Sequence, residues 1–377
     1  MTGSGRAARA SAVVGLTGVL IAVPALHLPT GGLLPGELAS PGALQVLALM
    51  LVFAALAVTY DLLFGFTGLL SFGHALFFAV GVYGTDIAMT SWHLGLLPAA
   101  VVALGVGVVL PVLVGGVALR VEGIAFAMVT LAFAQAGAIA VGQNLLGATG
   151  GDLGLGLPSQ QVPAALIGIV HTRNLYWLAL GLFALVYAAS WWLTSSPTGR
   201  VWQAIRENER RVEVLGLRPY RFKLLAFVLA SVLATLVGIV YLLLVSGAQP
   251  QVTTPDFTVT LLVMVVLGGA GRLWGAAIGG VLYTYLDQRL GEWAQSSAVQ
   301  HLPGLLRVPL SQPLFVLGLL FVLFVLFVPG GLSGVLVRVT GGARRRDAQG
   351  DVERDVERDE QTSSRIPARA TRESGDG

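Results

Sequence analysis

The chain has 377 residues, of which 55% are hydrophobic and only 11% charged, whereas soluble domains carry roughly 25% charged residues. So much apolar surface exceeds what one soluble core can bury, but it is normal for a bundle of membrane helices. The chain has no cysteine, which excludes disulfides, thiolate metal sites and cysteine nucleophiles. The net charge of +3 comes from basic residues spread between apolar runs, which argues against a nucleic-acid partner.

Long apolar runs predict an all-α integral membrane protein, since a membrane helix needs about 20 mainly apolar residues. The first run follows Arg6 and Arg9 but contains Pro24 and lacks a clear cleavage site, so we interpret it as a retained helix and not a signal peptide. About ten transmembrane helices are expected. The predicted spans are 11–28, 43–64, 71–90, 96–118, 124–143, 174–194, 223–246, 257–271, 274–290 and 311–336.

The positions of arginine and lysine predict the orientation of these spans, because cytoplasmic loops carry an excess of both. With a cytoplasmic N-terminus, the outside connections hold only Arg173, Arg289 and Arg307. Every other Arg and Lys before residue 347 then falls inside. The prediction is therefore a multi-pass protein of the cell inner membrane with both termini in the cytoplasm.

Three regions follow from this layout. We expect residues 1–10 to form a cytoplasmic N-terminus and residues 11–336 to form the transmembrane domain. Residues 337–377 alternate acidic and basic side chains with almost no large apolar ones. Such a segment cannot bury enough surface to offset chain entropy, so we expect a disordered cytoplasmic tail.

Two glycine-rich segments, 65–85 and 265–283, interrupt the apolar runs. Glycine allows helices to approach closely and to unwind where a cavity satisfies the backbone, and broken helices often build substrate sites in transporters. The first segment also holds Ser71 and His74, so we interpret it as part of a substrate path. The alternative for His74 is a hydrogen bond to a neighbouring carbonyl. The similar placement of the two segments hints at two related halves.

Asp61 and Asp86 are the carboxylates nearest to the apolar runs. A charge at the bilayer centre costs at least a few kcal/mol, so such residues default to a functional role. Both fall near predicted helix ends, where they can reach water. Proton coupling through them is therefore the less favoured interpretation.

A charged segment, residues 195–223, follows the sixth span. Ser196 followed by Pro197 is typical of a helix start, and Gly216 followed by Pro219 is typical of a helix end. The segment predicts one amphipathic cytoplasmic helix. Its mixed charges favour docking on a partner protein over lying on the lipid surface. The residues that share its apolar face are Val201, Ile205, Val212 and Leu215.

Five segments in the same order are similar to signatures of the permeases of branched-chain amino-acid ATP-binding-cassette importers, and the resemblance covers about residues 44–332. Thr149–Gly151 resembles the external TGG turn of that family, and Gly199–Gly216 resembles its cytoplasmic coupling loop. The five segments are Gly65–Tyr83, Arg120–Gln135, Thr149–Gly151, Gly199–Gly216 and Leu262–Gly275.

The resemblance implies a division of labour among subunits. A second permease subunit completes the path through the membrane lipid, two cytoplasmic ATP-binding-cassette ATPase subunits drive it, and an extracytoplasmic binding protein delivers the substrate. The implied substrate pathway residues are Ser71, Gly73, His74, Thr130 and Gln135. The implied ATPase-coupling residues, within the loop 195–222, are Gly199, Arg200, Ala204, Ile205, Arg206, Glu207 and Gly216.

The leading hypothesis is thus a permease for branched-chain or other small neutral amino acids, without a cofactor and without its own ATPase. A phosphate-binding loop needs Gly-Lys-Ser/Thr, and the only lysine, Lys223, follows Phe222. The alternative is a secondary transporter or channel that works alone on a small neutral solute such as urea or amides. An intramembrane enzyme fits less well, because no HExxH motif or Ser/His arrangement is visible.

Overall fold

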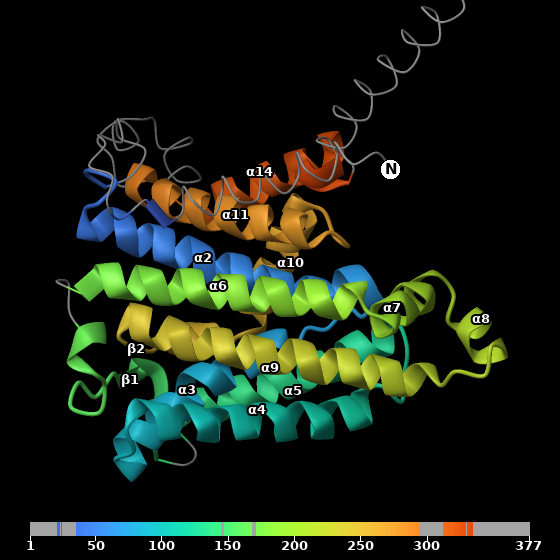
Figure 1. Ribbon diagram of the computed structural model, residues 1–377, viewed down its shortest axis with the longest axis horizontal. Coiled ribbons are helices and arrows are strands. Elements are labelled where there is room, and N and C mark those ends of the chain that lie inside the picture. The colour runs from blue at the N-terminus through green and yellow to red at the C-terminus, as the bar shows by residue number, and fades with distance from the viewer. Residues whose placement is uncertain are drawn as a thin grey trace, which may run out of the picture.

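The computed structural model describes residues 21–22, 24, 35–144, 147–167, 171–294, 312–328 and 330–334. Within them lie eleven α-helices and one two-stranded ribbon (Figure 1). The helices are α2 (Pro41–Asp61), α3 (His74–Trp92), α4 (Leu96–Ala118), α5 (Ile124–Gly142), α6 (Thr172–Ser195), α7 (Pro197–Glu207), α8 (Glu209–Val214), α9 (Pro219–Val245), α10 (Pro255–Gly268), α11 (Leu273–Ala294) and α14 (Pro313–Phe327). The ribbon pairs β1 (Leu155–Gly156) antiparallel with β2 (Gly247–Ala248).

Six helical segments of the described residues are long and apolar enough to cross a membrane. They are α2 with the π-helical turn η2 (Leu62–Thr67), then α4, α5, α6, α9 and the segment Leu314–Gly334 that contains α14. A seventh candidate is the pair α10 and α11, which bends by 118° at a short break. The prediction of an all-α membrane protein is therefore confirmed. The predicted first span, 11–28, and the tail, 337–377, lie outside the described residues.

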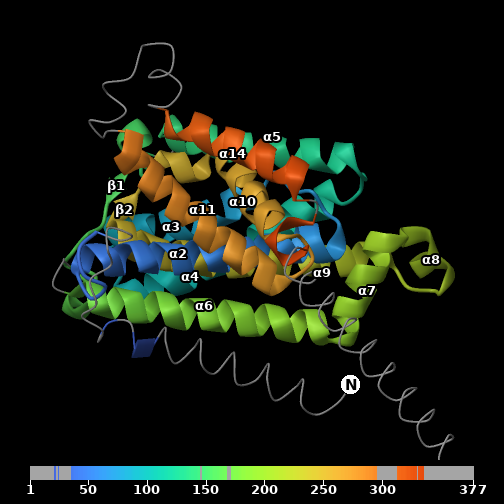
Figure 2. The ribbon, with the colours of Figure 1, turned by 90° about the horizontal axis from the view of Figure 1, so that it is seen from above.

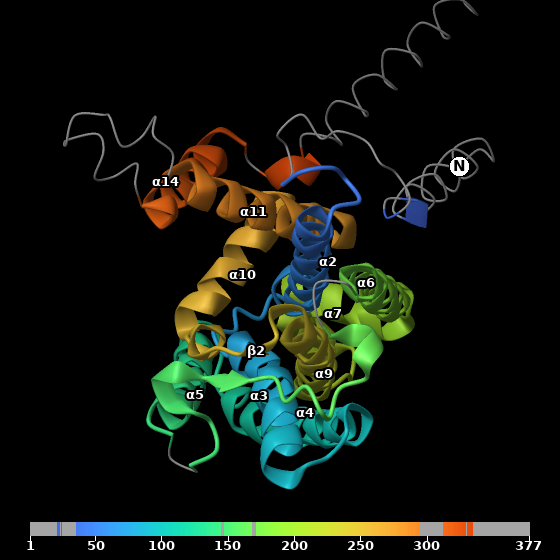
Figure 3. The same cartoon turned by 90° about the vertical axis from the view of Figure 1, so that its left-hand side faces the viewer.

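Helix α3 corresponds to the predicted span 71–90 but is less apolar than the six segments, because it carries His74 and Asp86. Both side chains are fully buried. Figure 3, which looks along the bundle from its ribbon end, shows α3 and α9 enclosed by the neighbouring helices. Polar groups are tolerated in a helix of this kind because protein and not lipid surrounds them.

The contact between α3 and α9 is a close approach of two backbones. A Cβ atom on Gly81 would collide with the carbonyl of Thr235, and one on Gly238 would collide with the carbonyl of Phe78. The hydroxyl of Thr235 donates to the Phe77 carbonyl at 3.0 Å across the same contact. Small residues allow such packing where lipid removes the hydrophobic drive between helices.

The glycine-rich segments break helices, as predicted. After η2 the chain turns at Gly68, which has φ +77°. Between α10 and α11 it turns at Gly269 and Gly271, with φ of +103° and +82°. These left-handed conformations favour glycine. The relation between two halves of the chain stays a prediction.

The two ends of the bundle differ in character. At one end, which we call the α7 end, the Tyr220 hydroxyl donates to the Gly116 carbonyl at 3.0 Å and joins the start of α9 to the end of α4. At the other, the ribbon end, β1 and β2 pair next to the TGG turn, in which Thr149 donates to the Val141 carbonyl at 2.8 Å.

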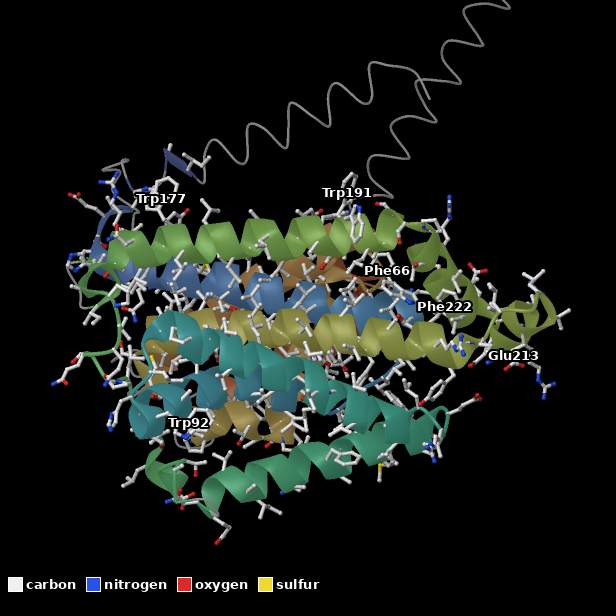
Figure 4. All side chains as sticks on the ribbon, turned by 60° about the horizontal axis from the view of Figure 1, so that its bottom comes forward. Phe66, Trp92, Trp177, Trp191, Glu213 and Phe222 are labelled. Atoms are coloured by element: carbon white, nitrogen blue, oxygen red, sulfur yellow. The ribbon has the colours of Figure 1, made fainter. Side chains whose placement is uncertain are left out.

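Tryptophans support a membrane position between these ends. Trp177 and Trp191 lie on the outer side of α6 (Figure 4), about 21 Å apart along the axis at 1.5 Å per residue. Trp191 is 61% exposed. Trp92 lies at the ribbon end. Exposed tryptophans near both ends of a bundle are typical of the two membrane interfaces.

We predict that Gly81→Ala destabilises the protein by about 1–3 kcal/mol, because the added methyl group meets the backbone of α9. The measurement is the thermal midpoint of the detergent-solubilised protein. The matched control is Gly105→Ala on α4, where nothing lies within 4 Å of the new Cβ. Equal midpoints for the two variants would contradict the close contact of α3 and α9.

Single cysteines test the orientation, because the chain has none of its own. Leu153 at the ribbon end is 97% exposed, and Val214 in α8 is 88% exposed. An impermeant maleimide should label Leu153→Cys on intact cells and Val214→Cys only after permeabilisation. The reverse pattern would overturn the predicted cytoplasmic position of the α7 end.

Candidate functional site

Helix α7 begins where the sequence predicts. The Ser196 hydroxyl accepts a hydrogen bond from the Gly199 amide at 3.2 Å, and Pro197 takes the first helical position. Both features satisfy or remove N–H groups that a helix start leaves unpaired. Gly199 packs against the carbonyls that end α6, so a larger residue would not fit there.

The prediction of one continuous helix up to Gly216 is wrong. The chain breaks at Asn208, whose backbone is extended (φ −161°, ψ 103°). Its side-chain oxygen accepts a hydrogen bond from the Arg211 amide at 3.1 Å and starts the short helix α8. Asparagine is a strong N-cap residue, so Asn208 was the signal that the periodicity of the apolar residues concealed.

The buried face of this loop also differs from the predicted one. Trp202, Ile205 and Val212 are buried, whereas Leu215 is 78% exposed. The Trp202 indole N–H donates to the Phe222 carbonyl at 2.9 Å and holds α7 against the start of α9. The break at Asn208 explains the difference, because it changes the direction in which later residues point.

Helix α8 is the part that projects. Figures 1 and 2 both show it beyond the end of the bundle, and Figure 4 shows Glu213 farther out than Phe222. Lys223 pairs with Glu209 and ties the base of α8 to α9. Val214 and Leu215 remain exposed at its tip. An exposed apolar pair on a charged projection is typical of a docking surface.

Arg206 points the other way, into its own bundle. Its guanidinium donates to the carbonyl of Gly65 in η2. Its side chain passes Gly68 and Gly271, where a Cβ atom would lie 3.1 Å and 2.7 Å from it. A pocket of about 400 Å³ opens here. It is lined by Gly65, Phe66, Gln203, Arg206, Glu207 and Gly271.

Asp61, at the end of α2, completes the same cluster. Its Oδ1 accepts a hydrogen bond from the Gly271 amide at 2.8 Å. Its Oδ2 is buried without a hydrogen-bond partner among the described residues, within electrostatic reach of Arg206. A carboxylate in this position satisfies an amide that the break between α10 and α11 leaves without a helical partner.

Three of the predicted pathway residues meet at the turn before α3, which contains Ser71 and Gly73 and is contacted by Thr130 from α5. The Ser71 hydroxyl accepts from the Gly73 amide at 3.2 Å. The Thr130 hydroxyl of α5 accepts from the Phe72 amide at 3.1 Å and donates to the Ala127 carbonyl at 2.9 Å. Their polar groups therefore hold the turn against α5. Gln135 is exposed on another side of α5 and does not join them.

His74 is fully buried between α2 and α3. Its Nε2 lies 2.9 Å from the Thr59 hydroxyl, and its ring meets the Tyr60 ring edge-on with centroids 5.3 Å apart. Its Nδ1 has no hydrogen-bond partner among the described residues. A hydrogen bond between neighbouring helices therefore satisfies Nε2 of His74. Its partner is the Thr59 hydroxyl and not the backbone carbonyl of the alternative interpretation.

The predicted coupling residues divide by position. Gly199 and Ile205 are buried against the bundle, and Arg206 is bonded to Gly65. The exposed ones are Arg200, Ala204, Arg206, Glu207 and Gly216, so Arg206 makes its bond from the surface of the bundle. Sequence reasoning missed Trp202, Asn208 and Asp61 as parts of this site. The cap at Asn208 is a local contact, whereas the roles of Trp202 and Asp61 depend on contacts with other segments.

Cysteine reactivity checks this division. We expect Leu215→Cys to react with a soluble maleimide roughly tenfold faster or more than Ile205→Cys, because the buried position reacts only through local opening. The measurement is the labelling rate of the solubilised protein. Similar rates would show that α7 does not pack on the bundle as described.

Comparison with known proteins adds relatives. Residues 42–327 match the family model described as branched-chain amino acid transport system / permease component. The LivM permease of the high-affinity branched-chain amino acid transport system of Salmonella typhimurium is 26% identical over 318 residues, covering 78% of this chain and 70% of LivM.

Permeases for ribose and for autoinducer 2 match shorter parts of this chain. The autoinducer 2 import permease LsrC of Klebsiella pneumoniae is 31% identical over 37% of this chain and 41% of its own. The ribose import permease RbsC of Escherichia coli is 29% identical over 32% of this chain and 39% of its own. No solved structure matches the chain.

Proposed function

The chain belongs to the family of permease components of branched-chain amino acid transport systems, and from this premise we propose that it is a permease subunit of an ATP-driven importer for branched-chain or other small neutral amino acids. Separate cytoplasmic ATPase subunits supply the energy. A second permease subunit completes the path, and an extracytoplasmic binding protein delivers the substrate.

The observation that carries the proposal is the projecting loop of α7 and α8. A lone channel has no need for a helix that ends outside the bundle with Val214 and Leu215 exposed. The surrounding side chains have both signs of charge, with Arg210, Arg211 and Glu213 in the same short helix. A lipid surface would favour a uniformly basic face, so the loop fits a groove on a protein partner.

The loop is also firmly attached to the bundle, so it can transmit movement. Trp202 and the ion pair of Lys223 with Glu209 fix it to α9, which runs without a break to the ribbon end. A partner that moves α8 would therefore move a helix that spans the bundle. On this proposal the loop 195–222 is the coupling element, with α8 as its contact surface.

For the substrate path we propose the region around the turn before α3. Ser71, Gly73 and Thr130 lie there, with His74 at the start of the helix. The hydrogen bonds of Ser71, Gly73 and Thr130 hold the turn in one shape, so these three residues would form a rigid wall of the path more than a set of free ligands. Gln135, exposed on α5, would reach the path from the side that a second permease subunit covers.

Amino acids are the proposed cargo because the match to LivM extends over most of the chain, whereas the matches to the ribose and autoinducer 2 permeases cover about a third. The charged residues of this chain do not by themselves select leucine, isoleucine or valine. Substrate choice in such a system also depends on the binding protein.

Co-purification tests the docking surface. The chain is co-expressed with its candidate ATPase, permease and binding-protein partners and purified through a tag on this chain. We expect Leu215→Asp to reduce the ATPase recovered about tenfold or more, because a charge replaces an apolar contact at the centre of the interface. The control is Leu153→Asp, which changes an even more exposed leucine at the opposite end.

Uptake then separates the candidate functions. Liposomes that hold the full complex should accumulate leucine, isoleucine or valine only with ATP and binding protein. If no ATPase associates and the chain alone moves urea, amides or amino acids, the stand-alone channel or secondary transporter takes the place of this proposal.

A further inference from the structure

Three segments that are far apart in the sequence meet at one arginine. Arg206 on α7 donates to the Gly65 carbonyl in η2 and lies against Gly271 in the turn between α10 and α11. Asp61 joins the other two segments to each other through its bond to the Gly271 amide. The cluster thus connects the loop that leaves the bundle with two broken helices inside it.

Glycines make room for the arginine side chain. At Gly68 and Gly271 φ is positive, and a Cβ atom would also crowd Arg206. At Gly65 a Cβ atom would collide with the Asp61 carboxylate. The sequence predicts a substrate-path role for segment 65–85, and here this segment and segment 265–283 each supply one side of the space that Arg206 occupies.

The bonded groups are those that broken helices leave without partners. The Gly65 carbonyl belongs to a π-helical turn at the end of α2, and the Gly271 amide belongs to the break before α11. A buried backbone group that is left without a hydrogen-bond partner costs about 1–3 kcal/mol. Arg206 and Asp61 therefore stabilise the shapes of both breaks, and a shift of α7 would remove one of these bonds unless the breaks moved with it.

The position of Arg206 argues against a role in holding the partner. One nitrogen of its guanidinium donates to the carbonyl of Gly65 although the residue is exposed overall, while the exposed apolar pair lies in α8, beyond the break at Asn208. Trp202, one turn before Arg206 on the same side of α7, attaches the helix to α9. Two connections thus leave the loop, one to α9 and one through Arg206 to α2 and the α10–α11 turn.

We propose that Arg206, fixed by the Gly65 carbonyl and backed by Asp61, is the positioning residue that transmits movement of α7 to the end of α2 and to the α10–α11 turn. This inference rests on the proposed function. On this proposal α8 attaches the ATPase. Arg206 couples the hydrolysis of ATP with the movement of substrate. Loss of Arg206 then leaves an assembled complex that hydrolyses ATP without moving substrate efficiently.

The experiment uses the full complex in liposomes, with Arg206→Met, Arg206→Lys and Asp61→Asn. Three quantities are measured: ATPase recovered with the tagged chain, ATP hydrolysed, and leucine taken up. We expect unchanged recovery and a fall in uptake per ATP of about fivefold or more for Arg206→Met, the lower end of typical coupling between sites. Uptake per ATP should fall less for Arg206→Lys and for Asp61→Asn, because each variant keeps part of the hydrogen bonding in the cluster.

The matched control is Arg120→Met. Arg120 also lies at the α7 end, just after α4, and donates to the Gly116 carbonyl of that helix at 3.3 Å. Among the described residues it makes no hydrogen bond to a distant segment. Its uptake per ATP should equal that of the parent complex. A fall equal to that of Arg206→Met would attribute the effect to loss of charge at this end and overturn the inference.

A cross-link supplies a readout that a purely structural role would not move. Phe66 in η2 and Gln203 in α7 line the same pocket as Arg206. In the Arg206→Met background, cysteines at these two positions joined by a short bis-maleimide should restore uptake per ATP, because the link replaces the lost connection. Each single cysteine with the same reagent serves as the control.

The outcomes separate the two proposals. Loss of the ATPase from Arg206→Met, or normal uptake per ATP, would overturn the assignment of Arg206 while leaving the importer intact. Failure of the cross-link to restore uptake would also overturn it. If the parent complex itself recovers no ATPase, the proposed function fails, and this inference fails with it.

Discussion

Backbone groups away from water must find hydrogen-bond partners inside the protein, and this constraint governs both broken helices of the bundle. The π-helical end of α2 exposes the Gly65 carbonyl, and the break before α11 exposes the Gly271 amide. Arg206 and Asp61 satisfy them from a different segment in each case. The breaks are therefore stable only while α2, α7 and the α10–α11 turn stay together.

The same requirement gives the loop between α6 and α9 two separate tasks. Its first helix, α7, is bound into the bundle through Trp202 and Arg206, and its second, α8, carries Val214 and Leu215 into solvent. The break at Asn208 separates them. In the proposed importer, attachment and coupling can then fail separately.

The packing of the other helices depends on how closely their backbones approach one another. Gly81 and Gly238 bring α3 and α9 into backbone contact, which buries the polar residues of α3 without lipid contact. The outer helices, α4, α5 and α14, expose apolar side chains, as lipid or a second permease subunit requires. Polar groups such as those of Thr130 and Ser71 are used internally, and so the turn before α3 keeps one shape.

The sequence by itself determined the membrane class, most of the helix bounds, the helix start at Ser196 and the glycine breaks, because these depend on local hydropathy, capping and backbone freedom. It also carried the resemblance that the family match confirmed. It did not indicate that Asn208 splits the charged helix or that Trp202 takes the buried position, since apolar spacing alone fits either. The cluster of Asp61, Arg206 and Gly271 was decided only by tertiary structure. Residues separated by more than a hundred positions meet there because each satisfies a group that a distant break leaves unpaired.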